Sequence, residues 1–87
     1  MKIIKKNGNL LDFQPSKIKT SIENASRDIN IQLNSKEIEL IVSDVEVILK
    51  SLSRDVTSSY EVRSIVVDAL IKYGYNDIAK SYILNLF

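Results

Sequence analysis

The pattern of apolar and polar residues predicts a short β-hairpin at the start of the chain. Apolar pairs at positions 3–4 and 10–11 flank the dipeptide Asn7-Gly8. Asn-Gly between two apolar pairs is typical of a type I′ turn, because both central residues of that turn need positive φ. We expect the hairpin over residues 2–13. Two strands alone are only marginally stable, so the hairpin must pack against other elements.

The rest of the chain changes to the period of amphipathic helices. Four helices are predicted, at about residues 15–29, 35–52, 58–73 and 76–86. Asn34 is followed three residues later by Glu37, which is the spacing of a capping box at a helix start. Ser58 and Glu61 repeat this spacing before the third helix. Gly74 fits the position just after a helix end, where a left-handed backbone is favoured.

Residues between the second and third helices add one more candidate element. Val56-Thr57 is too short to predict by itself, but it is a candidate third strand beside the hairpin. With 87 residues, the chain is expected to form one domain. The order of elements predicts an α+β fold, in which a small N-terminal hairpin is capped by four α-helices.

The composition excludes many classes of enzyme. The chain has no Cys, no His and no Trp, and only two glycines, Gly8 and Gly74. It therefore has no zinc ribbon, disulfide, thiol nucleophile, catalytic triad or imidazole base. Two glycines so far apart also exclude a glycine-rich phosphate loop. We expect a binding or regulatory module and not an enzyme.

The positive charge is concentrated at the N-terminal end. Residues 1–19 contain five lysines and one aspartate, whereas the remainder contains seven basic and ten acidic residues. Such a local field attracts a polyanion such as a triphosphate. The small net charge of +1, and the lack of aromatic residues among the lysines, argue against nucleic acid as a partner. Apolar runs are too short for a membrane span, and no signal peptide is recognisable, so we expect a cytoplasmic protein.

Three lysines in this region form a candidate anion site. Lys5 and Lys6 end the first predicted strand, and Lys17 falls in the first turn of the first helix. A helix N-terminus binds anions through its free N–H groups and the positive end of its dipole. Lysine on an edge hairpin also protects against aggregation. The spacing alone leaves both interpretations open.

Two stretches resemble the ATP-cone domain. Ile-Ile-Lys-Lys-Asn-Gly, then Phe13 and then Lys17-Ile18, is similar to the family's opening of apolar-x-Lys-Arg-Asp-Gly, Phe-Asp and Lys-Ile. Residues 56–62 and 78–84 resemble the closing half of the same domain, in the form found at the N-terminus of anaerobic ribonucleotide reductases. The resemblance covers nearly the whole chain.

This resemblance implies an allosteric module that binds ATP or dATP, with Mg²⁺ arriving on the nucleotide. It also implies control of the activity or oligomeric state of an attached or partner protein, through self-association or a ribonucleotide-reductase-type partner. The alternative is an interaction or oligomerisation domain of the same fold that has lost the nucleotide. Two departures favour the alternative, because Lys6 replaces the family's Arg and Gln14 replaces its Asp.

The resemblance also implies which residues contact the nucleotide. In the hairpin, Ile3 would lie against the base, and Lys5 and Lys6 would hold phosphates. Lys17 and Ile18 would lie under the ribose and phosphates.

The closing half of the domain would supply further contacts. Thr57 would offer its hydroxyl and backbone N–H to a phosphate, and Glu61 would approach the sugar. Tyr82 or Asn85 would close the pocket from the fourth helix.

Overall fold

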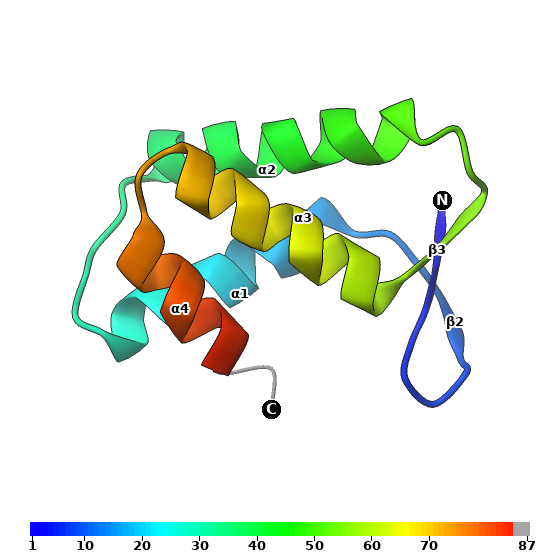
Figure 1. Ribbon diagram of the computed structural model, residues 1–87, viewed down its shortest axis with the longest axis horizontal. Coiled ribbons are helices and arrows are strands. Elements are labelled where there is room, and N and C mark those ends of the chain that lie inside the picture. Colours follow the sequence, from blue (N-terminus) through cyan, green and yellow to red (C-terminus); the bar gives the residue numbers. More distant parts are fainter. Residues whose placement is uncertain (85–87) are drawn as a thin grey trace.

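A computed structural model describes residues 1–84 of the chain and confirms the α+β fold (Figure 1). Its elements, in chain order, are β1 (Lys2–Ile4), β2 (Leu10–Asp12), α1 (Pro15–Asp28), α2 (Ser35–Ser51), β3 (Val56–Ser58), α3 (Ser59–Lys72) and α4 (Asn76–Leu84). The part of the fourth predicted helix beyond residue 84 lies outside the described residues.

The three strands form one mixed sheet in the order β2-β1-β3. The central strand β1 pairs antiparallel with β2 and parallel with β3. In this register Ile3 lies opposite Leu11 on one side and opposite Thr57 on the other. The candidate third strand at Val56 is therefore confirmed.

The predicted type I′ turn of the hairpin is wrong. Gly8 has a φ of +87°, but Asn7 is not among the described non-glycine residues with positive φ. The Gly8 N–H donates to the Lys5 carbonyl at 2.8 Å, and the Lys5 N–H donates to the Asn9 carbonyl at 2.9 Å. This arrangement matches a three-residue loop with a glycine bulge. The Asn7 side chain accepts a hydrogen bond from the Asn9 N–H at 3.1 Å. This bond gives a backbone N–H of the loop a partner without positive φ at Asn7.

Side chains cap two of the helices as predicted. The Asn34 side chain accepts from the Glu37 N–H at 2.8 Å at the start of α2. The Ser58 hydroxyl accepts from the Glu61 N–H at 3.1 Å at the start of α3. Gly74, with a φ of +85°, ends α3. Each cap satisfies backbone groups that the helix itself leaves unpaired.

The hydrophobic core lies between the four helices. Helix α1 packs against α2 and α4, and α3 packs against the same two helices. The buried apolar residues are Ile18, Ile22, Ala25, Ile38, Ile41, Val42, Val45, Leu49, Val62, Val66, Ala69, Leu70, Ile78, Ala79 and Tyr82. Figure 1 shows the sheet at one end of this bundle, beside the N-terminal end of α3. No helix within residues 1–84 is long and apolar enough to cross a membrane.

Candidate functional site

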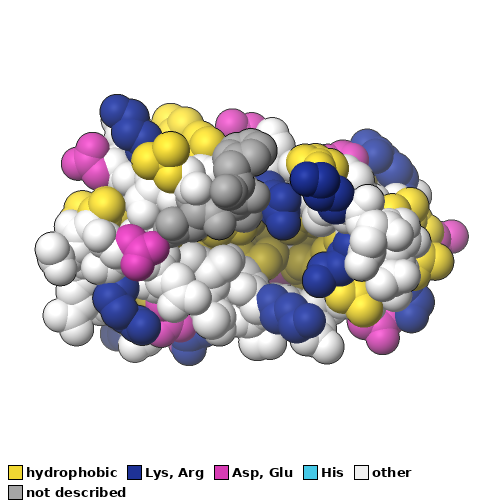
Figure 2. All heavy atoms as spheres, turned by 90° about the horizontal axis from the view of Figure 1, so that it is seen from below, with side chains coloured by type: hydrophobic (Ala, Val, Ile, Leu, Met, Phe, Trp, Pro, Cys, Tyr) yellow, Lys and Arg dark blue, Asp and Glu magenta, His cyan; other side chains and the backbone are white. Residues whose placement is uncertain are grey.

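A cleft of about 180 Å³ opens between the hairpin and the helices α1, α3 and α4. Its apolar lining consists of Ile3, Leu11, Phe13, Ile18, Val62 and Tyr82. Its polar lining consists of Lys5, Asp12, Gln14, Lys17, Ser21, Ser59 and Arg63. Figure 2 shows an apolar floor between the helical body and the hairpin, with Lys and Arg side chains around it.

A second hollow adjoins the cleft at its polar end. It has a volume of about 330 Å³ and is lined by Lys5, Lys6, Asn7, Ser59 and Arg63. Lys5, Ser59 and Arg63 line both spaces. The cleft and the hollow therefore form one continuous surface that is apolar at one end and basic at the other.

The basic end carries an excess of unpaired positive charge. In the described part of the chain, the ion pairs are Lys2–Asp12, Arg54–Glu61 and Lys72–Asp44, and none uses a cation of the cleft or the hollow. Among residues 1–84, the carboxylate that lines the cleft is that of Asp12, which accepts a hydrogen bond from Lys2. This hydrogen bond, with the charge of Lys2, lowers the pKa of Asp12 below its ordinary value. Asp12 is thus a charged but already partnered group.

Two helix N-termini meet at the cleft and add to its positive potential. Ser59, the first residue of α3, lines it, as do Gln14 and Lys17 from the start of α1. Within residues 1–84, no side chain caps α1, because Gln14 makes no capping hydrogen bond. Lysine in a first helical turn is electrostatically unfavourable, since it faces the positive end of the helix dipole. An anion bound at this point would relieve both the missing cap and the charge repulsion.

The floor of the cleft is fixed by packing between α1 and α4. Tyr82 is only 5% exposed, and its hydroxyl lies 3.4 Å from the Ser21 hydroxyl. Ser21 also donates a 2.8 Å hydrogen bond to the Ile18 carbonyl. Tyr82 therefore has a fixed position in a preformed apolar floor.

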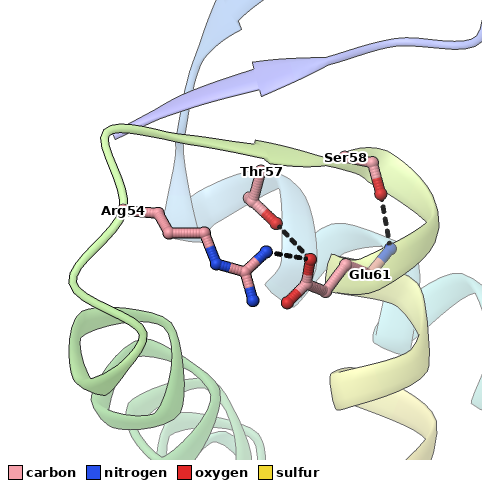
Figure 3. A network of polar contacts seen from close by, with 4 residues as sticks. All are labelled: Arg54, Thr57, Ser58 and Glu61. Carbon is pink, nitrogen blue, oxygen red and sulfur yellow. Dashed lines mark hydrogen bonds and ion pairs between the residues drawn. The ribbon is translucent and has the colours of Figure 1, made fainter.

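Thr57 and Glu61 do not line the cleft. The Thr57 hydroxyl is buried and donates to the Glu61 carboxylate at 3.0 Å. The same carboxylate oxygen accepts a hydrogen bond from Arg54 at 2.8 Å (Figure 3). This network ties β3 and the segment before it to the first turn of α3, whose cap is Ser58. The nucleotide contacts expected of Thr57 and Glu61 stay predictions.

The other predicted site residues divide between the two spaces. Ile3, Lys5, Lys17, Ile18 and Tyr82 line the cleft. Lys6 lines only the adjoining hollow. Asn85 lies outside the described residues.

Sequence reasoning missed Arg63, which lines both spaces from one turn inside α3. Arg63 lies four residues after Ser59, which directly follows the predicted cap Ser58, so both side chains lie on the same face of the helix. That spacing is the signal that could have found it.

An apolar cleft that continues into a basic hollow at two helix N-termini suits an anionic ligand with an apolar end. Residues 1–85 match the family model of the ATP cone domain. The chain therefore belongs to the ATP-cone family, whose members are nucleotide-binding regulatory modules of ribonucleotide reductases.

One curated relative supports this assignment. Ribonucleoside-diphosphate reductase subunit alpha of Chlamydia pneumoniae is 31% identical over 90 residues, covering 94% of this chain. The chain spans only 8% of the length of that relative.

Proposed function

We propose that the chain binds ATP or dATP in the cleft and thereby controls the activity or oligomeric state of an attached or partner protein. The observation that carries this proposal is the continuity of an apolar cleft with unpaired cations at two helix N-termini. Binding is then the chain's function, and the chain itself catalyses no reaction. The similarity to a ribonucleoside-diphosphate reductase subunit alpha supports a reductase-type partner or self-association. The proposal places the chain in the cytoplasm.

The two ends of the surface match the two ends of a nucleotide. Apolar residues such as Ile3 and Ile18 would hold the base and ribose. Burying the apolar faces of these groups is favourable and needs no directed polar contact. Lys5, Lys6 and Lys17 would hold the phosphates, because within residues 1–84 none of them forms an ion pair and charge-assisted hydrogen bonds to phosphate are strong.

Three predicted contacts stay part of the proposal: Thr57 and Glu61, which do not line the cleft, and Asn85, which lies outside the described residues. Thr57 and Glu61 flank Ser59, which does line it, and Asn85 follows from the family resemblance. Mg²⁺ would arrive with the nucleotide and be held by phosphates and water. Residues 1–84 contain no cluster of three acidic side chains that would hold the ion independently.

A second candidate function is protein association without nucleotide, and one observation favours it. Leu40 and Val47 are 50% and 63% exposed, and they lie seven residues apart on one face of α2. Exposed apolar residues at that spacing lie on the same side of a helix, where both can contact a partner. Under this alternative, association would be the same with and without ATP.

A thermal-shift panel with ATP, dATP, GTP and CTP, each with Mg²⁺, tests the proposed function. A ligand at about 100 times its Kd stabilises the folded state by about 2.7 kcal/mol. In a domain of this size, each kcal/mol raises the melting temperature by roughly 4–8 °C. We expect a clear rise with ATP and dATP, and a much smaller rise in Lys5→Ala.

The matched control for this panel is Lys36→Ala, which removes a lysine from the first turn of α2, outside the cleft. This variant should respond to ATP like the wild type. No rise with ATP or dATP at millimolar concentration would contradict the proposed function and leave the association hypothesis.

A further inference from the structure

We propose that Arg63 binds the phosphates of the ligand through two parallel hydrogen bonds, as the guanidinium that the described residues bring to the site. This inference rests on the nucleotide-binding function proposed above. Arg63 lines both the apolar cleft and the basic hollow, so it lies where the two spaces join. A ligand that extends from the cleft into the hollow would come close to Arg63, as it would to Lys5 and Ser59, which also line both spaces.

The hairpin contributes cations of a different kind. The cations that it brings to the site are Lys5 and Lys6. A lysine ammonium is a compact point charge on a flexible stem. A guanidinium is planar and presents a fixed fork of N–H donors that matches two phosphate oxygens at once. Among the cleft-lining and hollow-lining residues, Arg63 alone offers that geometry.

The surroundings of Arg63 leave these donors available. Within residues 1–84, it forms neither a hydrogen bond nor an ion pair. Its guanidinium carbon lies 5.8 Å from the centroid of the Tyr60 ring. A cation–π contact restrains the guanidinium but uses none of its in-plane N–H groups.

Charge in the neighbourhood also favours an anion beside Arg63. The side chain is half-buried and shares its hollow with Lys5 and Lys6, at the positive end of the α3 dipole. Like charges gathered on one surface repel one another, and an anion between them removes that repulsion.

Arg54 provides the matched contrast on the same side of the fold. Its guanidinium is engaged by the Glu61 carboxylate at 2.8 Å, and Figure 3 shows it directed toward that carboxylate. Arg54 lines neither the cleft nor the hollow. The Arg54 guanidinium thus already has a carboxylate partner, whereas that of Arg63 has none among residues 1–84.

Isothermal titration calorimetry with ATP and Mg²⁺ tests the role of Arg63. The proteins compared are the wild-type chain, Arg63→Lys, Arg63→Gln, Lys5→Ala and the control Arg54→Lys. We expect Arg63→Lys to bind ATP about tenfold more weakly, because charge is kept but the fork is lost. Arg63→Gln should bind more weakly still, and Arg54→Lys should stay within about twofold of the wild type. Melting curves without nucleotide verify that each variant is folded.

The outcomes distinguish this inference from the proposed function. If wild-type chain does not bind ATP, the proposed function fails, and the role of Arg63 fails with it. If the wild type binds and Lys5→Ala does not, but both Arg63 variants bind like the wild type, only the role of Arg63 is overturned. Wild-type affinity in Arg63→Lys with loss in Arg63→Gln would overturn the bidentate contact, because charge alone would then suffice.

Discussion

Ile3 on β1 lies directly opposite Leu11 on β2, and both residues line the cleft. In an antiparallel pair, side chains of opposed residues lie on the same face of the sheet. The apolar wall of the cleft therefore depends on the register of the hairpin. The loop closed by Gly8 sets that register, since loop length and turn type determine which residues are opposed.

Replacing Gly8 by alanine should weaken nucleotide binding without unfolding the helices. An added Cβ at Gly8 meets nothing within 4 Å, but the φ of +87° strains any L-residue. We expect a cost of about 1–2 kcal/mol for a residue held in this region. The hairpin should loosen, the affinity for ATP should fall several-fold, and the helical circular dichroism should be unchanged.

Gly74→Ala is the matched control for Gly8→Ala. Gly74 has nearly the same φ, +85°, and also has open space around it, but it ends α3 outside the cleft. This variant should lose a similar stability and keep its affinity for ATP. Equal losses of affinity in the two variants would show that hairpin register does not control the site.

Lys17→Ala should change stability and affinity in opposite directions. Without nucleotide, removing a positive charge from the first turn of α1 should stabilise the fold by about 0.3–1 kcal/mol. With nucleotide, the variant should lose most of its affinity for ATP. Urea unfolding measures the first effect and calorimetry the second.

Lys36→Ala in the first turn of α2 separates the electrostatic effect from ligand binding. It should show a similar gain in stability with no change in affinity. A Lys17→Ala variant that is less stable and still binds ATP normally would mean that Lys17 has a structural role instead.

Ser81→Ala should destabilise the contact between α4 and α1 while sparing the site. Ser81 is 6% exposed, and its hydroxyl donates a 2.8 Å hydrogen bond to the Ala25 carbonyl, in the last turn of α1. The last four carbonyls of a helix have no partner within the helix, so this hydroxyl supplies one. Loss of the bond should cost about 1–3 kcal/mol in urea unfolding. A variant as stable as the wild type would rule out this role of Ser81.

Stability should fall at acid pH partly because of Asp44. The Tyr73 hydroxyl hydrogen-bonds to Asp44, and Lys72 lies 3.3 Å from the same oxygen. The hydrogen bond from Tyr73 is the main cause that lowers the pKa of Asp44 below its ordinary value. A carboxyl with a lowered folded pKa contributes its stability above the unfolded pKa of about 3.9 and loses it as the pH falls through the folded value.

Melting curves between about pH 5 and pH 2 measure this contribution. Asp44→Asn should be less stable than the wild type at neutral pH and should show a smaller decrease toward acid. Part of the decrease should persist, because the pKa of Asp12 is also lowered. Parallel pH profiles for the two proteins would show that Asp44 makes no such contribution.

Most of the fold could be predicted because its determinants are local. The caps at Asn34 and Ser58 act within three residues of each helix start, so the sequence contains both partners. The strand at Val56 depended on tertiary pairing with β1 and so stayed a candidate. The predicted turn type was wrong because Asn7 stabilises the loop through a side-chain hydrogen bond to the Asn9 N–H and not through a positive φ.

The candidate site was harder to predict, since its residues meet only in the folded chain. Clustering of lysines near the first helix start pointed to the basic end of the surface. The ion pair between Arg54 and Glu61 could not be predicted, because it depends on the path by which the chain brings Arg54 close to α3. Arg63 was missed although its spacing from Ser59 places it one turn from the start of α3, because only the folded chain brings that helix end against the hairpin.

A titration of ¹⁵N-labelled chain with ATP and Mg²⁺, followed by amide chemical shifts, tests the central claim most directly. We predict concentration-dependent shifts at the cleft, at Lys5, Lys17, Ser59 and Arg63, with residues 39–47 on α2 unaffected. Shifts confined to α2, or no shifts at millimolar ATP, would contradict the claim that this cleft is a nucleotide site.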